Sequence, residues 1–218
     1  GVNYYDGQGF MVKSSLGVSS AMELSGAAVC IQAGTTTELN LADWGKANGI
    51  EYNSVVSDTN AQTLTNYDAG RCDVLTTDAS GLYSMRAAAS DPSEHVVLPE
   101  IISKEPLGPV VRQGDDQWFN IVRWSLNAMI TAEELGVTSA TVDDVSNNPE
   151  RERLMGRSGS THEYVGLTPD WTYQIVKQVG NYSESFERNI GINTPIGIAR
   201  GVNALWTDGG ILYSPPFR

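Results

Sequence analysis

Two short polar segments contain residue types that bind charged ligands, and the first of them is residues 34–37. It reads Gly-Thr-Thr-Thr and lies between an apolar run and a predicted helix. A helix N-terminus has unpaired N–H groups and a partial positive charge, and threonine hydroxyls add further donors. The segment is therefore suited to a carboxylate or another anion. On spacing alone, a plain threonine N-cap with Glu38 in the first turn is the favoured interpretation.

The second polar feature is Asp78, which ends the apolar run 74–78 and directly precedes another predicted helix. In an open parallel sheet, ligands bind beyond the carboxyl ends of the strands, so we expect Asp78 and the threonine segment on one rim. A carboxylate beside a donor-rich helix end offers opposite charges to the two ends of an amino acid. Helix N-capping by Asp78 explains this residue equally well.

Motifs typical of catalysis are not found in the sequence. His95 and His162 are the only histidines, and neither belongs to a nucleophile or metal-binding pattern. The sequence has no GxSxG or HExxH motif and no glycine-rich phosphate loop. We therefore expect a protein that is not an enzyme and that holds neither a metal nor a cofactor.

The composition is that of a globular protein able to bury a core, with 218 residues and 40% hydrophobic content. The formal net charge of −12 argues against nucleic acid or an anionic membrane surface as a partner, because both require clustered Lys and Arg. No stretch approaches the roughly 18 apolar residues that span a bilayer, so membrane insertion is not expected. The first residues lack the features of a signal peptide, which we expect to have been removed or never to have been part of this sequence.

Apolar runs and amphipathic stretches alternate through the first hundred residues, with short connections between them. This alternation predicts a parallel sheet flanked by helices. The predicted strands are residues 9–13, 27–32, 52–56, 72–76 and 95–98, and the predicted helices are residues 37–47, 59–67 and 79–89.

The pattern changes near residue 108, where we place a boundary between two parts. A helix-start signal at residues 114–116 precedes apolar residues at helical spacing, and the chain from there on is helical and loop-rich without a series of strands. Two interpretations remain open for this second part. It is either a small all-helical domain or a set of helices that complete a domain whose sheet lies elsewhere.

Several segments together resemble a known protein family. The segments YDGQGFMV (5–12), VCIQAGTTTELN (29–40) and GRCDVLTTD (70–78) are similar to the general L-amino-acid and polar-amino-acid periplasmic binding proteins. The tail segments QVGNY (178–182), FERN (186–189) and RGVNALW (200–206) are similar to the general amino-acid branch. Each motif alone is weak, but their order and spacing together are specific.

The resemblance implies an α/β fold, the type II Venus-flytrap fold of periplasmic binding proteins. One α/β lobe (lobe 2) would be complete, and the helical C-terminal part of lobe 1 would accompany it. Relatives begin with a stretch that forms most of lobe 1, including an arginine that clamps the ligand carboxylate, and we expect this sequence to start after that stretch. The implied division is hinge crossovers at 1–7 and 108–112, lobe 2 at 8–107, and the C-terminal part of lobe 1 at 113–218.

The resemblance also implies roles for particular residues. Thr36, with Thr35 and Gln32 nearby, would bind the ligand α-carboxylate, and Asp78 would bind the α-ammonium group. Two cysteines, Cys30 and Cys72, by themselves permit either one disulfide or two buried thiols; the family favours the disulfide.

The implied function is capture of free L-amino acids in the periplasm by lobe closure, followed by delivery to the permease subunits of an ABC importer. Two other functions stay open. One is an enzyme on the same fold, such as a dehydratase that acts on a small carboxylate. The other is a sensor or adaptor module that recognises a protein partner, which a large exposed apolar patch would favour.

Overall fold

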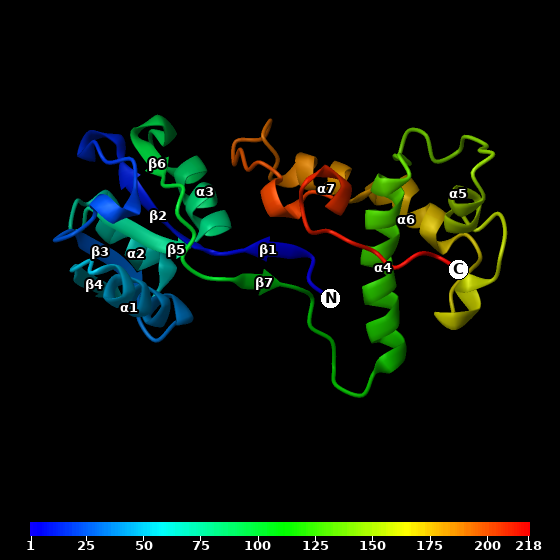
Figure 1. Cartoon of the computed structure of the whole chain (residues 1–218), viewed down its shortest axis with the longest axis horizontal. Coiled ribbons are helices and arrows are strands. Elements are labelled where there is room, and N and C mark those ends of the chain that lie inside the picture. The colour runs from blue at the N-terminus through cyan, green and yellow to red at the C-terminus, as the bar shows by residue number, and fades with distance from the viewer. The chain divides into compact units, whose positions relative to one another are not determined.

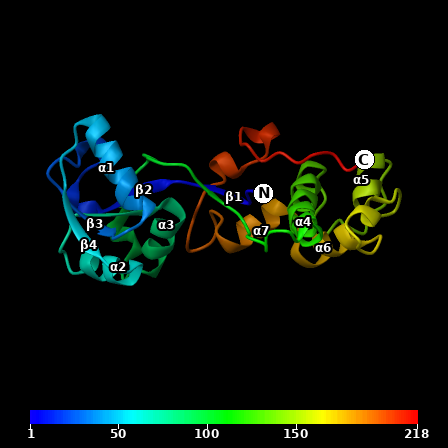
Figure 2. The same cartoon turned by 90° about the horizontal axis from the view of Figure 1, so that it is seen from below.

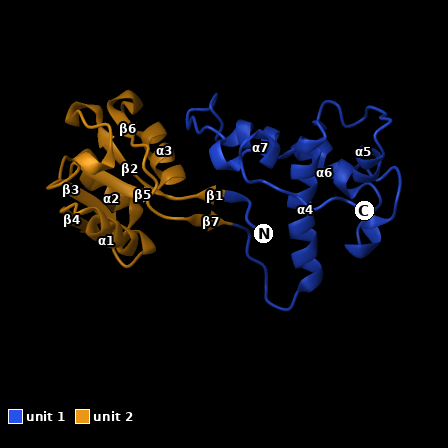
Figure 3. Cartoon of the chain, in the orientation of Figure 1, with its two compact units in different colours: residues 1–4, 108–218 blue, residues 5–107 orange.

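The computed structural model describes all of residues 1–218, and the chain divides into two compact units. Unit 1 contains residues 1–4 and 108–218, and unit 2 contains residues 5–107 (Figure 3). The chain passes from one unit to the other twice, after residue 4 and after residue 107. A two-stranded sheet of β1 (Tyr4–Asp6) and β7 (Glu105–Leu107) coincides with these two passages.

Unit 2 is built on a five-stranded mixed sheet (Figure 1). Strand β3 runs parallel to β4 and β5, whereas β2 runs antiparallel to both β5 and β6. The prediction of a purely parallel sheet is therefore wrong for β2. Parallel neighbours need a crossover helix, which α1 and α2 supply between β3, β4 and β5, but no helix of this kind leads into β2. The strands in sheet order are β4 (Asn53–Ser57), β3 (Ala28–Gln32), β5 (Val74–Asp78), β2 (Gln8–Lys13) and β6 (His95–Val97).

Helices cover both faces of this sheet, as Figure 2 shows. Phe10 of β2 packs in a core cluster with Leu41 of α1, whereas the next residue, Met11, packs with Leu82 of α3 on the other face. This alternation follows from the two-residue period of a strand, and both faces are apolar because both are covered. The helices are α1 (Thr36–Asn48) on one face, and α2 (Asn60–Asp68) and α3 (Ala79–Ala88) on the other.

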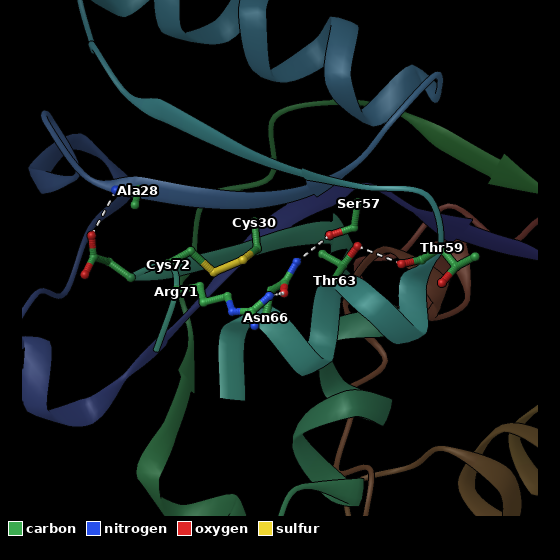
Figure 4. The surroundings of a disulfide bond; sticks show 9 residues. Ala28, Cys30, Ser57, Thr59, Thr63, Asn66, Arg71 and Cys72 are labelled. Atoms are coloured by element: carbon green, nitrogen blue, oxygen red, sulfur yellow. Dashed lines mark hydrogen bonds between the residues drawn. A yellow bond between two sulfur atoms is a disulfide. The ribbon is translucent and has the colours of Figure 1, made fainter. Parts of the chain in front are cut away.

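A disulfide joins Cys30 of β3 to Cys72, two residues before β5, with 5.7 Å between the two Cα atoms (Figure 4). The disulfide that the resemblance implied is confirmed. Both cysteines are buried against Tyr67 of α2 in one core cluster. The bridge therefore links the strand that leads into the threonine segment to the segment that leads into β5 and Asp78.

Unit 1 is helical, as the sequence predicted for residues after 114. The carboxylate of Asp115 caps its longest helix by accepting from Trp118 N at 3.0 Å. A single isolated bridge, between Leu205 and Leu212, is the strand-like pairing outside the named strands. The helices are α4 (Asp116–Glu134), α5 (Pro149–Leu154), α6 (Trp171–Val179) and α7 (Tyr182–Asn189).

An ion pair connects α4 of unit 1 to the C-terminal segment. The Arg200 guanidinium lies 2.9 Å from the Glu133 carboxylate and 5.2 Å from the ring centroid of Tyr182 on α7. Burial raises the pKa of Glu133, and the charge of Arg200 partly offsets this effect. Arg200 therefore holds three segments of unit 1 together.

None of the helices combines the length and the apolar character that crossing a membrane requires.

The disulfide gives a first prediction about stability. Replacing both cysteines with alanine removes a link across 42 residues of chain, and the loop-closure entropy of the unfolded chain then costs about 3–4 kcal/mol of unfolding free energy. Urea denaturation of the variant and of the native protein, each with and without dithiothreitol, measures this loss. Dithiothreitol should destabilise the native protein but not the variant, which has no disulfide to reduce. Equal stability of the two proteins without reductant would contradict the prediction.

Candidate functional site

The carboxyl ends of three neighbouring strands meet at one edge of the unit 2 sheet. Because β4, β3 and β5 are parallel, the helices that follow them, α1, α2 and α3, all begin at this edge. A cavity of about 210 Å³ lies there. The four residues proposed from the sequence all line it, and the complete lining is Gln32, Thr35, Thr36, Thr37, Asn60, Thr76, Thr77, Asp78 and Glu105.

The threonine segment forms the donor side of this cavity. Gly34 adopts a φ of 66°, a left-handed conformation that favours glycine, and the helix begins at Thr36. Thr35 occupies the N-cap position, but its hydroxyl donates to the Gln32 carbonyl at 2.9 Å and does not cap the helix. The backbone N–H groups of Thr36 and Thr37 lie in the first turn, where a helix has no internal acceptor for them. The N-terminus of α1 therefore presents donors and a partial positive charge to the cavity.

Asp78 forms the acceptor side, because another residue caps its helix. Asp78 stands at the N-cap position of α3, yet its side chain makes no capping hydrogen bond. Asp6 of β1 takes this role instead: its carboxylate accepts hydrogen bonds from both the backbone N–H and the hydroxyl of Ser80. The capping interpretation of Asp78 is therefore wrong, and its carboxylate lines the cavity without a hydrogen-bond partner.

The electrostatic surroundings of Asp78 are unfavourable to its charged form. Partial burial raises the pKa of Asp78 above the ordinary value of 3.8, and the negative charges of Asp6 and Glu105 raise it further. No Lys or Arg side chain lines the cavity to offset these charges. A cation bound here would relieve the repulsion, so the site has a built-in preference for a positively charged group beside Asp78.

Several residues of the cavity were not proposed from the sequence: Asn60, Thr76, Thr77 and Glu105 line it, and Gln8 lies behind the lining. Glu105 lies just before Pro106, in a segment that the sequence marks only as a connection, so no local signal identifies it. Gln8 is fully buried, and its amide donates to the Thr37 carbonyl at 3.1 Å and to the Thr76 hydroxyl at 2.9 Å. A glutamine at the start of an otherwise apolar strand is the signal that identifies Gln8.

Gln32 and the histidines occupy different places with respect to the cavity. The amide of Gln32 donates to the Asp58 carbonyl at 3.2 Å, which holds this side chain at the cavity edge between β3 and α2. His95 instead lies 3.0 Å from the Tyr67 hydroxyl, and neither His95 nor His162 lines the cavity. The structure contains no group of three or more His, Cys, Asp or Glu side chains arranged to hold a metal ion.

The chain is similar in sequence to known periplasmic binding proteins. The chain is 59% identical over 221 residues to the general L-amino acid-binding periplasmic protein AapJ of Rhizobium johnstonii, which covers 100% of this chain and 65% of that protein. It is 55% identical over 220 residues to the glutamate/glutamine/aspartate/asparagine-binding protein BztA of Rhodobacter capsulatus, again 100% of this chain and 65% of the relative. The chain thus spans about two thirds of the length of these curated relatives. No family model matches the chain.

A solved structure extends the likeness to three dimensions. The ABC transporter periplasmic binding protein from Brucella ovis, determined with glutathione bound, superposes with a TM-score of 0.95 at 53% identity, over 100% of this chain and 70% of that one. The chain therefore belongs to the family of periplasmic binding proteins of ABC transporters. This result confirms the family resemblance and the α/β flytrap fold class, and the relatives are named as binding proteins rather than as enzymes.

The free Asp78 carboxylate gives a prediction about stability and pH. Because its pKa is higher in the folded protein than in the unfolded chain, the ionised group destabilises the fold at neutral pH. Asp78→Asn should therefore raise the unfolding free energy at pH 7, on the order of 0.5 kcal/mol. The gain should shrink as the pH falls through the raised pKa toward 3.8. Urea denaturation at pH 7, 5 and 4 measures the effect.

Asp6→Ala is the matched comparison, since Asp6 is a carboxylate at the same helix end that does cap it. This variant should lose about 1 kcal/mol at pH 7, the usual value of an N-cap. A stability loss of similar size in Asp78→Asn would contradict the assignment of the two roles.

Proposed function

We propose that the chain binds free L-amino acids in the periplasm, by lobe closure around the cavity of unit 2, and delivers them to the permease subunits of an ABC importer. The observation that carries this proposal is the pairing at one cavity of a donor-rich helix N-terminus with an unpartnered carboxylate, Asp78. An amino acid zwitterion presents the complementary charges at adjacent atoms.

In this proposal, the ligand carboxylate accepts hydrogen bonds from the α1 N-terminus at Thr36, with Thr35 and Gln32 at the cavity edge. The ligand ammonium group forms a charge-assisted hydrogen bond with Asp78. Burial and like-charge repulsion both raise the pKa of Asp78 in the free protein, and a bound ammonium group offsets the repulsion. The names of AapJ and BztA, which state amino-acid ligands, support the substrate class. Glutathione, the ligand of the Brucella ovis structure, also ends in a free α-amino acid group.

Residues 8–107 would act as the ligand-closing lobe in this function, with the hinge crossovers at 1–7 and 108–112 and residues 113–218 contributing to the other lobe. Two crossings of the chain between compact units support this division.

The two other functions have less support at this cavity. A dehydratase-like enzyme would require a general acid or base that titrates near neutral pH, and neither histidine lines the cavity. A large exposed apolar patch would favour a sensor or adaptor for a protein partner. The lining of this cavity instead consists of hydroxyl, amide and carboxylate side chains. Incubation with small hydroxy and amino acids, followed by product analysis, distinguishes an enzyme from a binding protein.

The test of the proposal is calorimetry with a panel of L-amino acids and glutathione on the complete protein. Asp78→Ala should weaken amino-acid binding at least 100-fold, because it removes the carboxylate that would pair directly with the ligand ammonium group. Thr36→Val should reduce the affinity less, by about threefold to tenfold, since the backbone N–H groups of α1 remain.

Asp43→Asn is the matched control, because Asp43 is an exposed carboxylate on α1 outside the cavity. It should leave the affinity unchanged. An affinity of Asp78→Ala equal to that of the native protein would reject the proposed site.

A further inference from the structure

We propose that Glu105 is a second ammonium-binding residue of this cavity, which acts together with Asp78. This inference rests on the proposed function, because it assigns a role within the same site. The sequence contains no motif for it, and it follows from the hydrogen bonds that hold Glu105 and from the acceptors that the cavity leaves unpartnered.

The Glu105 carboxylate is held by hydrogen bonds from two other side chains of unit 2. Its Oε1 atom accepts from Asn40 Nδ2 of α1 at 3.0 Å and from the Ser103 hydroxyl at 2.8 Å. The Ser103 hydroxyl in turn accepts from the backbone N–H of Gln8 at 3.1 Å, which ties this network to β2. One oxygen of Glu105 is therefore fixed by two donors, and the other oxygen, Oε2, receives none from the chain. A carboxylate held in this way is oriented before a ligand arrives.

Two carboxylates that line the cavity have oxygen atoms without a hydrogen-bond donor. The Asp78 carboxylate has no hydrogen-bond partner, and the Oε2 atom of Glu105 has none either. Buried or partly buried acceptors without donors are costly, so a site that collects them is complementary to a ligand rich in N–H donors.

The charges of the two carboxylates also favour a cation in this cavity. Asp78 and Glu105 both line the cavity, and the charge of Glu105 contributes to the raised pKa of Asp78. Two carboxylates that repel each other across a cavity without a basic side chain are each stabilised by one cation between them. An ammonium group has three N–H donors, so it can bond both carboxylates and still reach a threonine hydroxyl.

Glu105 lies in a strand where the chain passes between the two units. Glu105 belongs to β7, which is paired with β1 and ends at the second passage of the chain between the two units. A ligand that bonds Glu105 is therefore bound to a hinge strand as well as to the ends of β3 and β5.

The experiment compares two ligands on the complete protein, L-glutamine and glutaramate, which is glutamine without its α-amino group. Glu105→Gln should weaken the binding of glutamine about tenfold while leaving that of glutaramate nearly unchanged. The variant retains an oxygen that can accept from Asn40 and Ser103, so it removes the charge without removing the hydrogen bonds. Glu51→Gln, an exposed glutamate of the same unit, is the control and should change neither affinity.

Asn40→Ala provides a second variant with the carboxylate intact. It removes one of the two donors that orient Glu105, and it should lower the preference for glutamine over glutaramate by about threefold.

The outcomes separate the two proposals. If the native protein binds no amino acid, the proposed function fails. If the native protein binds glutamine, Asp78→Ala abolishes this binding, and Glu105→Gln retains the full preference over glutaramate, the role of Glu105 is overturned while the function stands. An equal loss of both ligands in Glu105→Gln would make Glu105 a structural residue of the hinge and would also overturn the inference.

Discussion

The hydrogen bonds between Asp6 and Ser80 determine the character of the candidate site. They satisfy the N-terminus of α3 from a neighbouring strand, so the residue at the N-cap position, Asp78, is not needed for capping. One side chain of this kind usually caps a helix at this end. The remaining carboxylate is partly buried among like charges, and it is available for a ligand because the fold has already met its own requirement elsewhere.

The cavity also depends on the parallel arrangement of β3, β4 and β5. Parallel strands bring three helix N-termini to one edge, where backbone N–H groups and helix dipoles are directed toward the same space. The disulfide between Cys30 and Cys72 links the two strand segments that lead into the donor and acceptor sides of the cavity. The stability of unit 2 and the geometry of the cavity thus share one covalent constraint.

In unit 1, the helices are stabilised through their packing and through one partly buried ion pair. Arg200 contacts the Glu133 carboxylate on α4 and lies over the Tyr182 ring of α7. Two charges removed from water stabilise a fold only when the geometry satisfies them, and breaking such a pair is costly. The segment RGVNALW, which resembles the general amino-acid branch, therefore includes a residue with a clear structural role in this unit.

The sequence by itself determined the alternation of strands and helices, the change of character near residue 108, and the pairing of Thr36 with Asp78 at the strand ends. These features follow from local periodicity and from the rule that parallel strands end at the same edge. The antiparallel direction of β2, the transfer of the capping role to Asp6, and the placement of Gln8 and Glu105 beside the cavity were decided only by the tertiary structure. Each of these depends on contacts between residues more than 60 positions apart, such as Asp6 with Ser80 and Asn40 with Glu105. Periodicity and capping rules describe only near neighbours along the chain, and no such rule specifies which distant carboxylate reaches a given helix end.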